Sequence, residues 1–171
     1  MPKDCATIEV DWRLRERRHK VRRGGWQSSG GVVVDLDTGK VLLVKNRREL
    51  SEGRNGWTWP KGKMDVGEGP VFAALREIAE EAGVMAEPLA RLATIQTKRA
   101  TRHYYIFAKI GDGLPVSEET LKLRWVSLRV ARRLLERKRD RQVLRAAKQL
   151  LRAFENGETD RLSLWKQTIA C

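Results

Sequence analysis

The sequence predicts a single domain of the α/β (α+β) class, in which helices pack against a sheet. Two apolar, valine-rich runs at 28–35 and 40–45 flank an Asp-Thr-Gly turn, a pattern typical of paired strands. Apolar residues recur at helical spacing in 70–82 and again in 143–154. The chain has 171 residues, of which 41% are hydrophobic, and this length suits one core rather than two.

Basic charge is concentrated in two outer segments. The net charge is +13, and residues 12–23 contribute seven Arg and Lys against one Glu, while residues 129–152 contribute ten against two acids. The rest of the chain is therefore nearly neutral. Such segments can bind nucleic acid, attract polyanionic substrates or form solvated helix faces. We favour a solvated face for 129–152, because its arginines alternate with a helical apolar stripe.

We expect a basic N-terminal lead at 1–26, the domain at 27–155 and a C-terminal extension at 156–171 that packs on the domain. Cys5 and Cys171 lack the spacing of a zinc site or a disulfide framework. No apolar run approaches the ~20 residues that span a bilayer, and the first residues lack a secretory signal. These features predict a soluble, cytoplasmic protein without membrane contact, and they leave its oligomeric state open.

The elements after the first strand pair follow from turn signals and periodicity. Residues 49–56 are polar and glycine-bearing, so we expect a surface loop there. Further strands and helices are predicted from β-rich runs and from helical apolar spacing. These are strands at 89–96, 103–110 and 123–126, and helices at 130–137 and 143–154, the second ending at Asn156-Gly157.

The segment 62–84, GKMDVGEGPVFAALREIAEEAGV, predicts a helix that begins at Pro70 and is capped at Gly83. Its apolar stripe is expected to be buried. The stripe consists of Val71, Leu75, Ile78 and Ala82.

Three glutamates of this helix stand at i, i+3 and i+4, which places their carboxylates on one face. They are Glu77, Glu80 and Glu81. Like charges at this spacing repel one another, and a hard divalent cation such as Mg²⁺ or Mn²⁺ would neutralise them with oxygen ligands. A solvated acidic face, with Arg76 pairing with Glu80, is the alternative.

The whole segment resembles the Nudix box: G, five residues, E, seven residues, then R-E-apolar-x-E-E-x-G-apolar. Every fixed position is satisfied, by Gly62, Glu68, Arg76, Glu77, Ile78, Glu80, Glu81, Gly83 and Val84. The resemblance extends loosely from about 27 to 151, and implies a Nudix-type α/β/α sandwich with a mixed sheet and a loop-helix-loop metal motif.

The resemblance also implies roles for the box residues. Glu77, Glu80, Glu81 and the carbonyl of Gly62 would bind Mg²⁺, with Mn²⁺ also expected to support activity. Glu80 and Glu81 would be the main ligands and act in catalysis. Residues matching Glu68 and Arg76 steady the loop in this family.

The general base differs between members of this family, some using a glutamate from a loop after the box. Glu118 and Glu119 precede Trp125 in such a loop. We predict Glu119 as a catalytic residue from its spacing to the tryptophan, with a surface acid as the alternative.

The implied activity is hydrolysis of a pyrophosphate bond in a small, phosphate-rich molecule, such as a nucleoside or dinucleoside polyphosphate or a similar X-linked diphosphate. The segment WTWPKGK at 57–63 resembles family members that act on dinucleoside polyphosphates and diphosphoinositol polyphosphates. The predicted substrate-binding cations are Lys45, Arg47, Lys61, Lys63 and Arg102.

Two alternatives remain. The basic segments would suit an RNA 5′-end pyrophosphohydrolase, although that branch more often has glutamine at the position of Lys61. A non-catalytic nucleotide- or nucleic-acid-binding domain of the same fold is the other alternative, and the complete set of box carboxylates argues against it. The base and leaving group of the substrate depend on loops outside the box.

Overall fold

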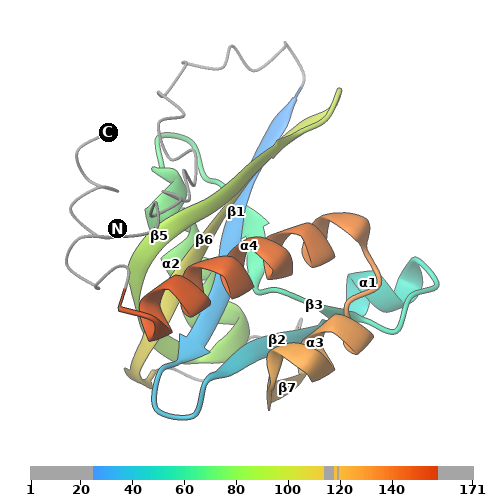
Figure 1. Cartoon of the computed structure of the whole chain (residues 1–171). Coiled ribbons are helices and arrows are strands. Elements are labelled where there is room, and N and C mark those ends of the chain that lie inside the picture. The colour runs from blue at the N-terminus through green and yellow to red at the C-terminus, as the bar shows by residue number, and fades with distance from the viewer. Residues whose placement is uncertain (1–24, 114–117, 119, 158–171) are drawn as a thin grey trace.

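The computed structural model describes residues 25–113, 118 and 120–157 (Figure 1). Its elements follow one another with short connections. In chain order they are β1 Trp26–Asp35, β2 Lys40–Asn46, α1 Arg47–Ser51, β3 Trp57–Thr58, β4 Lys61–Lys63, α2 Pro70–Ala82, β5 Val84–Gln96, β6 Ala100–Asp112, β7 Thr120–Val126, α3 Leu128–Leu134 and α4 Lys138–Glu155.

The sheet is mixed and is built around β1. Its main strand order is β3-β2-β1-β6-β5, with β4 also paired to β1 and β7 also paired to β2. β1 runs parallel to β6 along most of its length, and every other pair is antiparallel. The side of β1 away from β6 is shared, because β4 pairs with Ser28–Gly30 and β2 pairs with Val34–Asp35.

Two consecutive glycines allow this close packing around β1. A Cβ atom on Gly30 would lie 2.2 Å from the carbonyl oxygen of Pro60, just before β4. A Cβ atom on Gly31 would lie 2.0 Å from the carbonyl oxygen of Tyr105 in β6. Since real Cβ atoms do not approach oxygen so closely, only glycine fits at either position.

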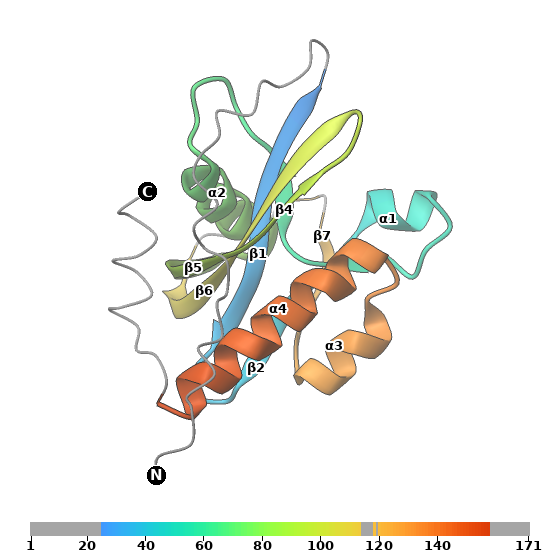
Figure 2. The ribbon, with the colours of Figure 1, turned by 45° about the horizontal axis from the view of Figure 1, so that its top comes forward.

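The valine-rich strands are buried on both faces, and alternate residues serve two separate cores. Val32 and Val34 pack with Leu135, Val143 and other residues of the α3–α4 side. Val33, between them, packs with the α2 side. Figure 2 shows α2 and α4 on opposite sides of the sheet. The predicted α/β/α sandwich with a mixed sheet is therefore confirmed.

Most predicted elements are present, with bounds that differ by several residues. The predicted loop at 49–56 was wrong in part, because its first residues belong to α1. Asn46 caps this helix, since its Oδ1 atom accepts a hydrogen bond from the Arg48 N–H at 2.8 Å. The predicted helix at 130–137 begins earlier, at Leu128, behind the Ser127 cap, and ends at Leu134. The stop at Asn156-Gly157 is confirmed, with Gly157 in the left-handed region at φ 70°.

Residues 1–24 of the predicted basic lead at 1–26, both cysteines and most of the predicted C-terminal extension lie outside the described residues. Among the described helices, none has the length and apolarity needed to cross a bilayer.

Candidate functional site

The α2 helix forms as predicted but divides its three glutamates between different surroundings. Ile78 and Ala82 are buried against the sheet, while Val71 and Leu75 are partly buried. Glu81 is also buried, at 5% exposure, on the turn between Ile78 and Ala82. By contrast, the Glu80 side chain is 54% exposed. The Gly83 cap at φ 59° then turns the chain directly into β5.

Arg76 ties the loop before α2 to the helix. Its Nε and Nη2 atoms donate to the two carboxylate oxygens of Glu68, both at 2.9 Å. Its Nη2 atom also donates to the Lys63 carbonyl oxygen at 2.9 Å, and its Nη1 atom donates to Glu77 at 2.9 Å and Glu80 at 3.2 Å. The hydrogen bonds that Glu68 accepts from Arg76 and from the Asp65 N–H lower the pKa of Glu68 to about 2.

Glu77 lies against the backbone of β4. A Cβ atom on Gly62 would lie 2.0 Å from the Glu77 Oε1 atom, inside the space that the carboxylate occupies. The glycine at this position is therefore required by the carboxylate beside it, and any side chain there would displace Glu77.

Glu81 is held by two hydrogen bonds from different elements. The Lys61 N–H donates to its Oε2 atom at 2.8 Å, and the Asn46 Nδ2 atom donates to its Oε1 atom at 3.1 Å. Burial raises the pKa of Glu81 to about 7, despite the lowering effect of the Lys61 charge and of these hydrogen bonds. A bound cation would favour the ionised carboxylate.

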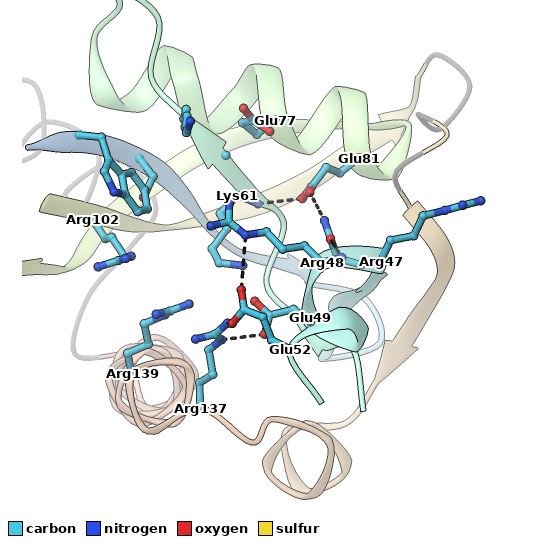
Figure 3. Close-up of a pocket in the computed structure, with 15 residues that line it drawn as sticks. Arg47, Arg48, Glu49, Glu52, Lys61, Glu77, Glu81, Arg102, Arg137 and Arg139 are labelled. Carbon is cyan, nitrogen blue, oxygen red and sulfur yellow. Dashed lines mark hydrogen bonds and ion pairs between the residues drawn. The ribbon is translucent and has the colours of Figure 1, made fainter. Parts of the chain in front are cut away.

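A pocket of about 770 Å³ opens beside these residues (Figure 3). Its acidic side includes Glu77 and Glu81, with Gly62 next to them. Its cations come from four places in the chain: Arg47 and Arg48 from α1, Lys61 and Lys63 from β4, Arg102 from β6, and Arg137 and Arg139 from the start of α4. Glu49 and Glu52, at α1, also line the pocket, so seven cations surround four carboxylates.

Seven of the twelve predicted site residues line this pocket, and five do not. Glu68 and Arg76 form the ion pair that holds the loop before α2 and are outside the pocket lining. Glu80 and Lys45 are outside its lining, since Lys45 pairs with Trp57 and Lys122 at the neighbouring strands. Glu119 lies outside the described residues, and its neighbour Glu118 is exposed in a turn.

The contribution of α4 to the pocket was not predicted from the sequence. Arg137 and Arg139 belong to the segment interpreted as a solvated face, yet both line the pocket. Asp140 holds the start of α4 next to the site. Its carbonyl oxygen accepts a hydrogen bond from the Trp59 Nε1–H at 3.1 Å, and its Oδ2 atom accepts one from the Thr58 hydroxyl at 3.2 Å. The sequence signal that could have suggested this contact is Asp140, a single acid among the cations of the first turn of α4.

Of the aromatic residues near the pocket that could stack on a base, most are buried and structural. Tyr104 and Tyr105 are buried at 1% exposure. His103 contacts Gln27 and Thr94 across neighbouring strands. Trp26 does line the pocket, and the Arg102 guanidinium lies 4.6 Å from the centre of its ring.

The profile of the NUDIX domain matches residues 25–147, most of the chain. The chain belongs to the Nudix family. The match starts at β1 and ends within α4, so it includes the box, the sheet and the pocket. The resemblance seen in the box is therefore confirmed.

Relatives of this Nudix chain are named as pyrophosphatases and phosphatases. It is 33% identical over 92 residues to the ADP-ribose pyrophosphatase of Bacillus subtilis, covering 54% of this chain and 49% of the relative. It is 33% identical over 138 residues to the 8-oxo-(d)GTP phosphatase of Mycolicibacterium smegmatis, covering 75% and 41%. The chain spans about half the length of the curated relatives it matches.

Solved structures show the same fold. The Ap4A hydrolase of C. elegans, crystallised as a binary complex, superposes with a TM-score of 0.61 at 24% identity, covering 75% of this chain and 99% of that one. This likeness supports the Nudix fold of the chain.

The donor chemistry at the pocket fits a hard divalent cation. Glu77 and Glu81 bring carboxylate oxygens next to the backbone of Gly62, and oxygen is the ligand type that Mg²⁺ prefers. Within the described part of the chain, no three acidic, histidine or cysteine side chains are already drawn together as a metal site. Arg76 instead neutralises Glu77 and Glu80, so a cation would compete with this arginine.

Proposed function

We propose that this Nudix chain is a divalent-metal-dependent pyrophosphohydrolase. Its substrate would be a nucleoside or dinucleoside polyphosphate, or a similar X-linked diphosphate. The observation that carries the proposal is the pocket, which places Glu77 and Glu81 among cations from four parts of the chain. The names of the B. subtilis and M. smegmatis relatives support this substrate class.

The box residues would hold the metal, as Nudix hydrolases generally need one. Glu77 and Glu81 would be ligands together with the Gly62 carbonyl, and Glu80 would join them after release from Arg76. When bound, Mg²⁺ or Mn²⁺ screens phosphate charge and lowers the pKa of water. The Glu68–Arg76 pair would keep the loop before α2 in place.

The cations would bind and orient the phosphate chain. Lys61 is preorganised for this role, because its Nζ atom donates to the Thr58 hydroxyl at 2.7 Å and its backbone holds Glu81. Lys63 and Arg47 line the same part of the pocket, and we propose that they contact non-bridging oxygens. Lys45, outside the lining, would act at most through long-range attraction.

In the reaction, a water oxygen bonds to phosphorus as the bridging P–O bond breaks, yielding X-phosphate and the remaining phosphate fragment. The proton of that water needs a base. We propose Glu119 for this role from its place after the box, and its test is the loss of the acidic limb of the pH–rate profile, the rise in rate as the base loses its proton, in Glu119→Gln.

The RNA 5′-end alternative keeps one structural observation in its favour. Exposed cations cover the outer faces of α3 and α4, and such a surface attracts a phosphate backbone. They are Arg129, Arg132, Arg133, Lys138, Arg141, Arg145, Lys148 and Arg152. If the activity is on RNA ends, triphosphorylated RNA will be cleaved in preference to free nucleotides.

The test is product release from a substrate panel, each member assayed with Mg²⁺, Mn²⁺ or EDTA. The panel holds nucleoside triphosphates, ADP-ribose, diadenosine polyphosphates, an inositol pyrophosphate and triphosphorylated RNA. Metal-dependent cleavage of one class supports the proposal and identifies the substrate. A folded protein that cleaves none of them would contradict it and favour a binding role.

A further inference from the structure

Three arginines converge at the end of the pocket remote from the box. Arg102 lies on β6 opposite Ser28 of β1, Arg137 caps α4, and Arg139 follows in the first turn of that helix. All three line the pocket. Figure 3 shows them across the pocket from Glu77 and Glu81, so they are not simply neighbours of the metal-binding carboxylates.

Arg102 is held in place without a carboxylate partner. Its guanidinium stacks over Trp26 at 4.6 Å, and no acidic side chain of the described residues lies within ion-pair distance of it. Stacking fixes the plane of a guanidinium and leaves its in-plane N–H groups available to an anion. Burial lowers the pKa of Arg102, and the charges of Arg139 and Arg137 lower it further.

The acids nearby do not balance this group. Arg137 is paired, since its Nε atom donates to Glu49 at 2.7 Å and its Nη2 atom donates to Glu52 at 2.8 Å. Of the acids in the described part of the chain, Arg139 lies within ion-pair distance of the fully buried Asp140 alone, with 3.7 Å between the Arg139 Nε atom and the Asp140 Oδ1 atom. Among the described residues, Arg139 thus has one buried carboxylate beside it and Arg102 has none at ion-pair distance, which leaves excess positive charge facing the pocket.

We propose that Arg102 and Arg139 form a second anion-binding subsite, which takes a phosphate group on the part of the substrate remote from the cleaved bond. The substrate would then be a pyrophosphate compound that carries a further phosphate on its far moiety, rather than one that ends in a neutral sugar or base. This substrate class rests on the proposed function, whereas the anion binding itself does not.

The subsite is tested by calorimetric binding of inorganic tripolyphosphate in EDTA. We expect Arg102→Gln and Arg139→Gln to weaken binding roughly tenfold or more each, as loss of charged hydrogen bonds does. The matched control is Arg124→Gln, because Arg124 also stacks on a tryptophan, Trp57, at 5.8 Å but lies outside the pocket lining. Thermal melting verifies that each variant is folded.

Two results would overturn the subsite: wild type that does not bind tripolyphosphate, or Arg102 and Arg139 variants that bind as tightly as Arg124→Gln. Having two independent variants keeps the test decisive if one fails to fold.

The far phosphate is tested with coenzyme A and dephospho-coenzyme A in the same assay, since they differ by one phosphate remote from the pyrophosphate. Wild type should bind coenzyme A several-fold more tightly, and Arg102→Gln should remove the difference. Equal binding by wild type overturns the far-phosphate assignment. If the panel is hydrolysed but binding does not depend on Arg102, the proposed hydrolase activity stands and the subsite is refuted. If binding depends on Arg102 but nothing in the panel is hydrolysed, the subsite stands and the proposed activity is refuted.

Discussion

At the scale of single residues, the three box glutamates differ in what surrounds them although their spacing is regular. Glu81 is buried and accepts hydrogen bonds from Lys61 and Asn46, Glu77 packs on Gly62, and Glu80 faces solvent. How well each carboxylate can bind a cation therefore depends on its burial and on the backbone around it, and not only on its place in the motif.

Glu81→Gln removes the buried carboxylate and keeps its shape. We expect turnover to fall by at least about a hundredfold, because mutating residues that only support the ligands of a metal site already lowers metal affinity or activity by about 10- to 100-fold. The measurement is kcat with saturating Mg²⁺ on the substrate that the panel identifies. Glu155→Gln, at the exposed end of α4, is the control. An unchanged rate in Glu81→Gln would refute its assignment as a ligand.

Gly62→Ala tests the contact between β4 and Glu77. The new methyl group would lie 2.0 Å from the Glu77 Oε1 atom, so the carboxylate must move. We expect a loss of about 1–3 kcal/mol in the free energy of unfolding, together with a fall in metal-dependent turnover. Chemical denaturation and initial rates measure the two effects. If the free energy of unfolding and the turnover both equal the wild-type values, β4 moves to accommodate the methyl group without displacing Glu77.

At the scale of elements, the short helix α1 joins parts that are distant in sequence. Its cap, Asn46, uses one side-chain atom for the first turn of α1 and the other for Glu81 at the end of α2. Glu49 of the same helix accepts hydrogen bonds from Arg54 and from Arg137 at the start of α4. α1 therefore connects the box to the arginine end of the pocket.

The pH dependence of stability should reveal this connection. Burial alone would raise the pKa of Glu49, but the hydrogen bond from Arg137, the Lys61 charge and the hydrogen bond from Arg54 lower it to about 2. A lowered pKa stabilises the fold above the unfolded-state value of 4.5, and this stability is lost as pH falls through about 2.

Glu49→Gln should therefore be less stable than wild type by about 3 kcal/mol at neutral pH, and the difference should shrink between about pH 5 and pH 2. Urea unfolding across that range measures it. Glu155→Gln should follow the wild-type curve throughout. A difference that does not change with pH would mean that Glu49 acts through packing rather than through its charge.

At the scale of the whole molecule, charge is arranged around a neutral core. The sheet is buried on both faces by apolar residues, while cations line the pocket and cover α3 and α4. A net charge of +13 should attract a polyanionic substrate before it contacts the site.

Salt should weaken this attraction. We expect kcat/KM to fall roughly tenfold or more between 0.05 and 0.5 M KCl, as the Debye length shortens, with little change in kcat at saturating substrate. Steady-state kinetics at fixed free Mg²⁺ measures both. Values of kcat/KM independent of salt would indicate that only short-range contacts act on the substrate.

The sequence by itself determined the family, because the box depends on local spacing, and the resemblance to that family then implied the α/β/α sandwich. The box occupies fixed offsets within 62–84, and helix and strand periods show which faces are apolar. The tertiary structure alone decided that Arg102, Arg137 and Arg139 meet, that Glu80 stays outside the pocket, and that Asn46 reaches Glu81. Periodicity describes neighbours along one element, whereas these contacts depend on how β1, β6 and α4 are placed against one another, which no local pattern encodes.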